Sequence, residues 1–148
     1  MELLAAQVNG TVLGWDSRQP QEVVQECNLN QGLGQGRAQH GATCLHHIPG
    51  TPHRYLIGSD LGSVFSLFVK DRPGQDRILG EFRGPRSCSP VRAVQRNPVI
   101  PKLFLTLGSW CAQVWSEESQ HSSILRTGGS PTSTSLGSGS TGWVAWPS

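Results

Sequence analysis

The sequence predicts an all-β protein made of short antiparallel strands, and three observations predict it. Gly (18) and Pro (10) are plentiful in the 148 residues, only 15% of which are charged, a composition typical of strands and turns. A repeated unit also occurs, in which an apolar strand and a tight turn precede a second strand ending on a large apolar residue. The copies are residues 3–15, 55–67 and 104–115. Their turn residues Gly10, Gly62 and Trp110 lie 52 and 48 residues apart, a period typical of β-propeller blades.

The first copy ends on Trp15-Asp16, the dipeptide after which the WD repeat is named. The chain holds about two and a half such units, whereas propellers close with roughly four to eight blades. We therefore predict a partial WD-type β-propeller over residues 1–127, with exposed strand edges at both ends.

The first unit is a hairpin whose turn is Val8-Asn9-Gly10-Thr11. An Asn-Gly pair supplies the positive φ angles of a type I′ turn, so this turn type is predicted. Residues 17–40 are polar and Gly-rich, and residues 31–36 are predicted to be a surface loop.

The next two units share one order, namely strand, Pro-containing turn, strand, tight turn, strand. In the second unit the predicted elements are a strand at 42–48, the hairpin 54–69 with its turn at 59–62 and its second strand at 63–69, and a strand at 77–82. In the third unit they are a strand at 90–95 and the hairpin 103–115. The strand 63–69 is apolar throughout, which indicates burial on both faces.

From Gly128 the chain becomes low in complexity and rich in Gly, Ser and Thr, and it ends in an apolar stub, 143–148. Such a composition is typical of a flexible linker. Residues 128–148 are therefore predicted to be a disordered tail.

Charge and hydropathy exclude several classes of protein. A net charge of +2 with no adjacent Lys or Arg residues argues against nucleic acid as a partner. No apolar stretch approaches the roughly 20 residues that span a bilayer, and the N-terminus carries no secretory signal, so neither a membrane nor export is expected. The expected location is therefore the cytosol. Because that compartment is reducing, the four cysteines are expected to be free thiols.

Residues 93–118 resemble the axonemal dynein intermediate chains, especially the outer-arm intermediate-chain-2 type. The resemblance is carried by Arg96-Asn97-Pro98, by Phe104-Leu-Thr106, by the Gly108-Ser-Trp110 turn and by the Trp115-Ser-Glu117 exit. Weaker similarity extends it over roughly residues 3–127. It implies a non-catalytic scaffold that binds dynein heavy chain and other intermediate and light chains, supports outer-arm assembly and ciliary movement, and works in the cytoplasm, the cytoskeleton and the ciliary axoneme.

The chain also departs from the WD pattern. That family often builds a buried hydrogen-bond network from a Gly-His pair, a turn Asp, a Ser or Thr and the strand Trp. Here Gly84 precedes Pro85, and Ser109 stands where the turn Asp is expected, so the third unit is expected to have an incomplete network. After residues 122–124 the chain changes to the Gly/Ser tail. The resemblance does not extend to the long N-terminal region with which family members engage light chains, so we do not expect that region here.

Several sequence features could suggest a binding or catalytic site, but each has a simpler structural interpretation. His46 and His47, with His40 and His53 nearby, are expected to be ordinary surface or packed histidines, because adjacent strand residues point to opposite faces. The segment Gly32–Gly36 lacks the Lys-Ser/Thr of a phosphate-binding loop. Asn9-Gly10-Thr11 fits the glycosylation pattern, but we interpret it as a turn.

The tryptophans Trp15, Trp110 and Trp115 could form a recognition surface, although packing in the core and between blades is the expectation. The carboxylates are scattered and form no convincing acid–base pair; they include Asp16, Asp60, Asp71, Glu81, Glu117 and Glu118. No catalytic, cofactor-binding or metal-binding residue is predicted.

The resulting hypothesis is a dynein-type scaffold without enzyme activity. Three alternatives stay open at this point. The chain could be a generic cytosolic WD-repeat adaptor, a truncated isoform whose exposed edges prevent a stable function, or a small hydrolase that uses His46 or His47.

Overall fold

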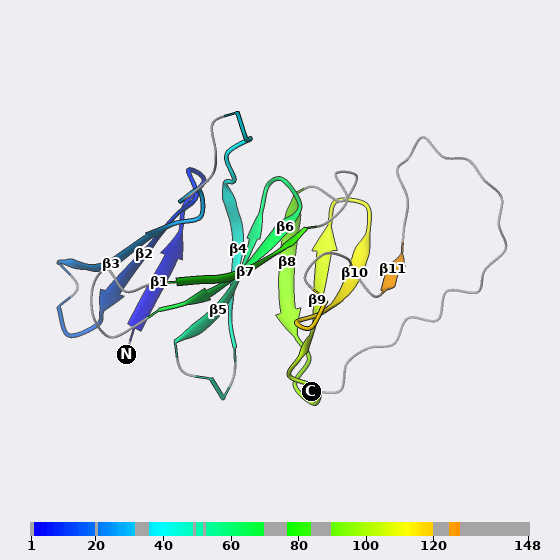
Figure 1. Cartoon of the computed structure of the whole chain (residues 1–148). Helices are drawn as coiled ribbons and strands as arrows, with labels where there is room; N and C mark the ends of the chain where they lie inside the picture. Colours follow the sequence, from blue (N-terminus) through cyan, green and yellow to red (C-terminus); the bar gives the residue numbers. More distant parts are fainter. Residues whose placement is uncertain are drawn as a thin grey trace, which may run out of the picture.

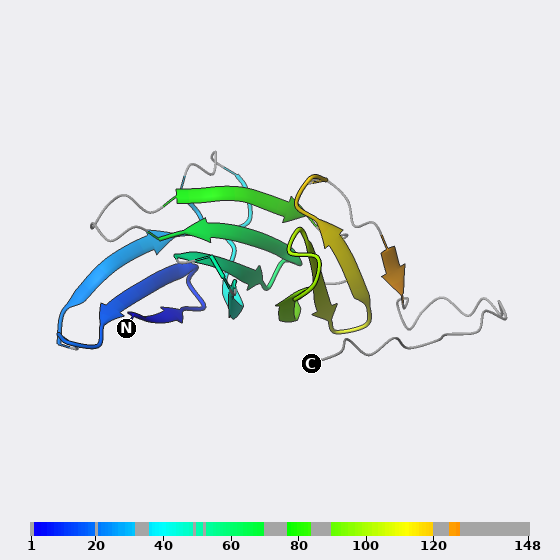
Figure 2. The ribbon, with the colours of Figure 1, turned by 90° about the horizontal axis from the view of Figure 1, so that it is seen from below.

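The described part of the chain folds into three consecutive antiparallel sheets of three, four and four strands. The computed structural model describes residues 2–19, 21–31, 36–48, 50–51, 53–69, 77–83, 90–119 and 125–127, and these contain strands and no helix. Hence the described part offers no helix with the length and hydropathy needed to cross a membrane. The second sheet lies between the first and the third (Figures 1 and 2). The prediction of an all-β, partial WD-type propeller is confirmed.

The first sheet has the order β1-β2-β3, with β1 at Glu2–Ala6, β2 at Thr11–Asp16 and β3 at Val23–Asn28. Strand β3 was not predicted, because residues 17–40 were described only as polar and Gly-rich, with a loop at 31–36. The strand carries only three apolar residues, and its buried positions include Gln25 as well as Cys27. A strand that buries a polar side chain gives a weak alternation of apolar and polar residues.

The predicted type I′ turn between β1 and β2 is wrong. In such a turn both central residues have positive φ, but here only Gly10 does, at 82°. Gly10 N donates to Gln7 O at 2.9 Å, and Asn9 Oδ1 accepts a hydrogen bond from Thr11 N at 3.0 Å. The loop is therefore a three-residue turn closed by a glycine in the left-handed region.

The second and third sheets repeat one order of four strands. The second contains β4 (Ala42–His47), β5 (Arg54–Ser59), β6 (Ser63–Phe68) and β7 (Arg77–Arg83). The third contains β8 (Val91–Arg96), β9 (Leu103–Gly108), β10 (Ala112–Ser116) and β11 (Leu125–Thr127). The predicted strands of both units are confirmed, whereas the three-residue β11 was not predicted.

The repeat extends to details of register. Both four-stranded sheets have an irregularity at the start of their first strand, between Ala42 and Cys44 in one and between Val91 and Ala93 in the other. The turn after β5 also matches the turn after β1, because Gly62 has a φ of 83° and its N–H bonds Ser59 O at 3.2 Å. The alignment of Gly10 with Gly62 therefore has a structural basis.

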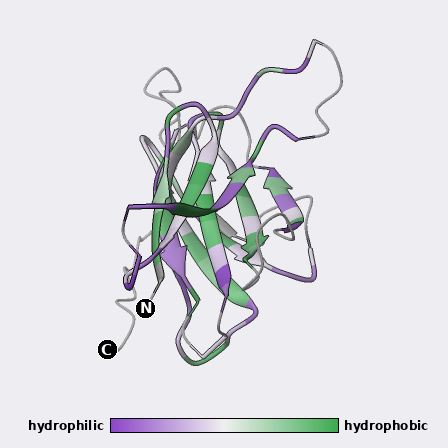
Figure 3. Cartoon of the chain, turned by 90° about the vertical axis from the view of Figure 1, so that its left-hand side faces the viewer, coloured by the Kyte–Doolittle hydropathy of each residue, from purple (hydrophilic) through white to green (hydrophobic). Residues whose placement is uncertain are grey.

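Strands β5 and β6 contribute to two hydrophobic cores. Ile57 and Phe65 face the first sheet, where they pack in a cluster with Val12, Cys27 and Leu29. Neighbouring residues on the same strands face the third sheet; Leu56 and Val64 pack there with Phe82, Phe104 and Trp115. The prediction that the strand after the turn is buried on both faces is confirmed. Figure 3 shows the hydrophobic residues concentrated on the strands and the hydrophilic ones on the connections.

The contact between the second and third sheets is close because Gly58 has no side chain. A Cβ atom at this position would lie 2.5 Å from Cys44 Sγ and 2.7 Å from Val91 Cγ1. Cys44 is a free thiol, and burial raises its pKa. Cys27 is buried and is not disulfide-bonded.

The expectation of four free thiols is wrong at Cys111, which is disulfide-bonded. The cysteine lies directly after the turn that follows β9, where 7% of its surface is exposed. Cys88, Asp71, most of the Gly32–Gly36 segment, Gly84-Pro85 and the predicted tail 128–148 lie outside the described residues.

Candidate interaction surface

The three tight turns lie at one end of the molecule, shown at the top of Figure 1 and called here the upper end. They connect β1 to β2, β5 to β6 and β9 to β10. The longer connections after β4 and β8 lie at the opposite, lower end. Rigid strands thus carry a different set of loops at each end, which is the arrangement that binding proteins commonly use.

A buried histidine links the first two sheets at the upper end. His40 is 9% exposed, its Nδ1 lies 3.2 Å from Ser59 Oγ, and its ring packs edge-on against Phe65 at 5.0 Å. Its Nε2 is 3.8 Å from Glu81 Oε1. His40 is thus packed in the interior, one of the two environments expected for the histidines, and its contacts match those of the histidine in a WD-type network.

The backbone around His40 is held by two further side chains. Asn30 Oδ1 accepts a hydrogen bond from His40 N at 2.7 Å, and Asn30 Nδ2 donates to His40 O at 3.1 Å. Asp60 Oδ1 accepts a hydrogen bond from Gly41 N at 2.8 Å. The sequence signal was a His-Gly pair immediately before a strand, and it was missed because the reverse order, Gly-His, was expected.

The third sheet contains another part of the same kind of network. Trp115 is fully buried, and its Nε1 donates to Thr106 Oγ1 at 2.9 Å. Ser109, which replaces the expected turn aspartate, instead accepts a hydrogen bond from Arg92 Nε at 3.3 Å. The Trp–Thr pair is thus present, while the residues that would complete the network fall in part outside the described chain.

Two glycines allow the first and second units to meet at the upper end. A Cβ at Gly10 would lie 2.3 Å from His40 O, and one at Gly41 would lie 2.3 Å from Val8 O. The β1–β2 turn therefore presses directly on the backbone that enters the second sheet. This contact fixes the β1–β2 turn against the start of the second sheet.

The three tryptophans have different environments. Trp115 lies in the core, stacked on Phe104 with an angle of 10° between the rings, so the packing prediction is confirmed there. Trp15 is half-buried and lines a cavity. The packing prediction is wrong for Trp110, which is 59% exposed at the tip of the β9–β10 turn.

Two arginines and one glutamate join the second and third sheets at the lower end. The Arg96 side chain is only 4% exposed and pairs with Glu117. Arg54 Nη2 lies 3.3 Å from the same carboxylate oxygen. A buried guanidinium needs such a partner, because an uncompensated charge in this position is strongly destabilising.

The cationic Arg96 also affects His46, on the adjacent β4. Burial lowers the pKa of the His46 imidazole, and the neighbouring His47 and Arg96 lower it further. His46 is partly buried and His47 is exposed, so the two adjacent histidines occupy different environments. Among the residues that the structure describes, no group of His, Cys, Asp or Glu side chains could hold a metal ion.

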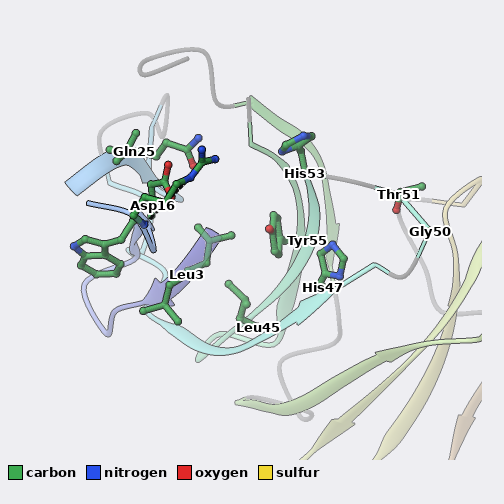
Figure 4. Close-up of a pocket in the computed structure, with 14 residues that line it drawn as sticks. Leu3, Asp16, Gln25, Leu45, His47, Gly50, Thr51, His53 and Tyr55 are labelled. Carbon is green, nitrogen blue, oxygen red and sulfur yellow. Dashed lines mark hydrogen bonds and ion pairs between the residues drawn. The ribbon is translucent and has the colours of Figure 1, made fainter. Parts of the chain in front are cut away.

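A cavity of about 1020 Å³ opens between the first and second sheets. Its lining includes Leu4, Leu45 and Tyr55, which also belong to the first hydrophobic core, and Figure 4 shows Leu45 and Tyr55 on the side of the second sheet. Asp16 lies at its edge, where its carboxylate accepts a hydrogen bond from Arg18 N; this bond is the main cause of its lowered pKa. The cavity is thus lined by both apolar and polar side chains.

Two further carboxylates make local contacts. Glu81 accepts a hydrogen bond from Ser63 Oγ at 3.1 Å and pairs with Arg83 at the same distance. Glu118 pairs with Lys102 at the surface, where an ion pair contributes little to stability.

Successive sheets with a shared strand order, a His–Ser contact in one and a Trp–Thr bond in another define a segment of a WD-type β-propeller. Its sequence is related to the axonemal dynein intermediate chains. It is 36% identical over 134 residues to dynein axonemal intermediate chain 2 of Rattus norvegicus, covering 85% of this chain and 20% of that protein. It is 32% identical over 127 residues to the ciliary dynein intermediate chain 3 of Heliocidaris crassispina, with 85% and 21% covered.

A third relative is the 70 kDa intermediate chain of the flagellar outer arm dynein of Chlamydomonas reinhardtii, 30% identical over 133 residues, with 88% of this chain and 23% of that protein covered. The resemblance first drawn from residues 93–118 is therefore confirmed. The chain spans about a fifth of the length of these relatives. No protein-family model matches it.

Proposed function

We propose that this chain is a non-catalytic scaffold that binds dynein heavy chain and supports outer dynein arm assembly and ciliary movement. The observation that carries the proposal is its 30–36% identity, over at least 85% of its length, to intermediate chains named as axonemal or of the flagellar outer arm. Its partners would be the heavy chain together with other intermediate and light chains. Its locations would be the cytoplasm, the cytoskeleton and the ciliary axoneme.

The physical mechanism of this scaffold is docking between proteins. Buried pairs such as His40–Ser59 and Trp115–Thr106 hold the strands, and the strands hold loops at both ends of the molecule. Loops on a rigid framework bind with little loss of conformational entropy. Residues 1–127 would supply this framework, and residues 128–148 would act as a linker.

The test is retention of dynein heavy chain from an axonemal extract by the immobilised full chain. A thermal unfolding experiment by circular dichroism precedes it, because only a cooperative transition makes a negative binding result informative. Selective retention of heavy chain and other dynein subunits supports the proposal. A folded chain that retains no dynein subunit would contradict it and leave a general WD-repeat adaptor as the better interpretation.

A further inference from the structure

Each tight turn at the upper end exposes one large apolar side chain. Val8 is 85% exposed, Leu61 36% and Trp110 59%, and they belong to the β1–β2, β5–β6 and β9–β10 turns respectively. We call these three side chains the turn row. Figure 1 shows these turns at the same end of three successive sheets.

Apolar residues at these positions are unusual for the local structure. Tight turns favour Gly, Asn, Asp and Ser, which supply special φ angles or bond their own backbone. The other turn residues here follow that preference, as Asn9, Gly10, Asp60 and Ser109 show. The side chains of the turn row are therefore not needed to form the turns, and each of them exposes apolar surface to water.

The turns are also held in fixed positions. Each is closed by a backbone hydrogen bond, at 2.9 Å in the first, 3.2 Å in the second and 2.8 Å in the third. The first presses on the backbone of His40, and the second is anchored through Asp60 to Gly41. A partner would not have to order these loops on binding, which removes an entropic cost.

A positive charge lies beside Trp110. The exposed Arg92 donates a hydrogen bond to the uncharged hydroxyl of Ser109, in the turn that carries Trp110. The carboxylates of Asp60 and Glu81 belong to the second sheet, where Asp60 accepts a hydrogen bond from Gly41 N and Glu81 pairs with Arg83. The charge next to Trp110 therefore favours a carboxylate on the partner, and tryptophan and arginine are both residue types enriched in binding hot spots.

From these observations we infer that the turn row, with Arg92, binds an acidic segment of a partner protein that carries spaced apolar side chains. Trp110 is the main apolar anchor, and Arg92 pairs with a carboxylate beside it. Leu61 and Val8 extend the contact across the second and first sheets. This inference rests on the proposed scaffold function, because it names the surface and the chemistry through which a partner would dock.

The test uses the full chain and a fluorescein-labelled 16-residue peptide made of Glu and Leu, with fluorescence anisotropy as the measurement. Saturable binding is expected that weakens with added salt, since charge pairing at an exposed site is screened. Substitution Trp110→Ala is expected to weaken binding at least about tenfold, as for a hot-spot residue. Arg92→Glu should weaken it to a similar extent, and a peptide with Lys at every Glu position should not bind.

Val99→Ala is the matched control, because Val99 is 75% exposed at the lower end and lies outside the turn row. It should bind the acidic peptide like the unmodified chain. The inference is overturned if the acidic peptide does not bind, or if Trp110→Ala and Val99→Ala bind it equally. Trp110-dependent sedimentation with phosphatidylserine vesicles in the absence of peptide binding would also overturn it, in favour of a lipid surface.

The heavy-chain experiment separates this inference from the proposed function. If the unmodified chain binds the peptide but retains no dynein subunit, the proposed function fails and the turn row stands. If Trp110→Ala retains heavy chain as well as the unmodified chain does while peptide binding is lost, the turn row is not the contact for heavy chain.

Discussion

Replacing Thr106 by Val tests the hydrogen bond inside the third sheet. The change keeps the branched shape and the strand preference of the side chain, but it removes the hydroxyl that accepts the bond from Trp115 Nε1 at 2.9 Å. Both residues are buried, with Thr106 3% and Trp115 0% exposed. Water therefore cannot replace the lost acceptor without opening the core.

The expected cost follows from this burial. Leaving a buried donor unpaired destabilises a protein by about 1–3 kcal/mol, whereas removing both partners is far less costly per bond. Trp115→Phe should also destabilise, because it leaves the Thr106 hydroxyl unpaired and a void beside Phe82 and Phe104. In the double variant Thr106→Val/Trp115→Phe the two costs should not add, and we expect a coupling of roughly 1–2 kcal/mol.

The free energies of unfolding would be measured by urea denaturation, with far-UV circular dichroism as the signal. Thr11→Val is the matched control: Thr11 is also a buried strand residue, but its hydroxyl accepts only a 3.4 Å bond from the partly exposed Asn28 side chain. Its expected cost is below about 1 kcal/mol. A Thr106→Val variant within about 0.5 kcal/mol of the unmodified chain, or additive costs in the double variant, would refute the reasoning.

Three further variants test other contacts by the same denaturation experiment. Gly10→Ala should cost more than Gly50→Ala, because both glycines have positive φ but only the first would place its Cβ 2.3 Å from backbone; equal costs would count against the close contact. Glu117→Gln should lower the free energy of unfolding by about 2–3 kcal/mol, because it leaves the buried Arg96 guanidinium without its carboxylate. The cost is below that of a fully buried pair because the site is partly exposed. An unchanged free energy of unfolding would mean that solvent compensates this charge. The pKa of His46 is lowered in the folded chain, so its contribution to stability is complete above about pH 7 and is lost as the pH falls through 6.5 toward the folded value. His46→Gln should accordingly lose less stability than the unmodified chain between pH 7 and pH 5, and parallel pH profiles would contradict this.

The strands that the sequence predicted well are those with apolar side chains on both faces or with clear turn residues at their ends. Strand β6 and the glycine turn before it are examples, since Val64, Phe65 and Leu67 are all buried. Strand β3 was missed because it buries Gln25, and no local pattern distinguishes a buried glutamine from one in a loop. The repeat period supplied the fold class, which no single strand could have done.

The surface residues were harder to predict than the strands. The exposure of Trp110 depends on the direction of a turn relative to two other sheets, and a single sequence carries no measure of that direction. The role of His40 depends on Ser59 and Phe65, which lie 19 and 25 positions further along the chain. The sequence placed these residues near turns and strand ends, but it did not indicate which of them face water.

The alternation of β5 side chains between two cores has a consequence for how the molecule opens. Ile57 belongs to one core and Leu56 to the other, so β5 can separate from its neighbours only if both cores are broken. Stability in such linear arrays is close to a sum of unit and neighbour terms, and the middle unit has two neighbours. In native-state hydrogen exchange the amides of β5 and β6 should thus exchange only through the largest unfolding event, while those of β1 and β10 exchange through smaller ones. The second sheet is then the last part of the chain to open.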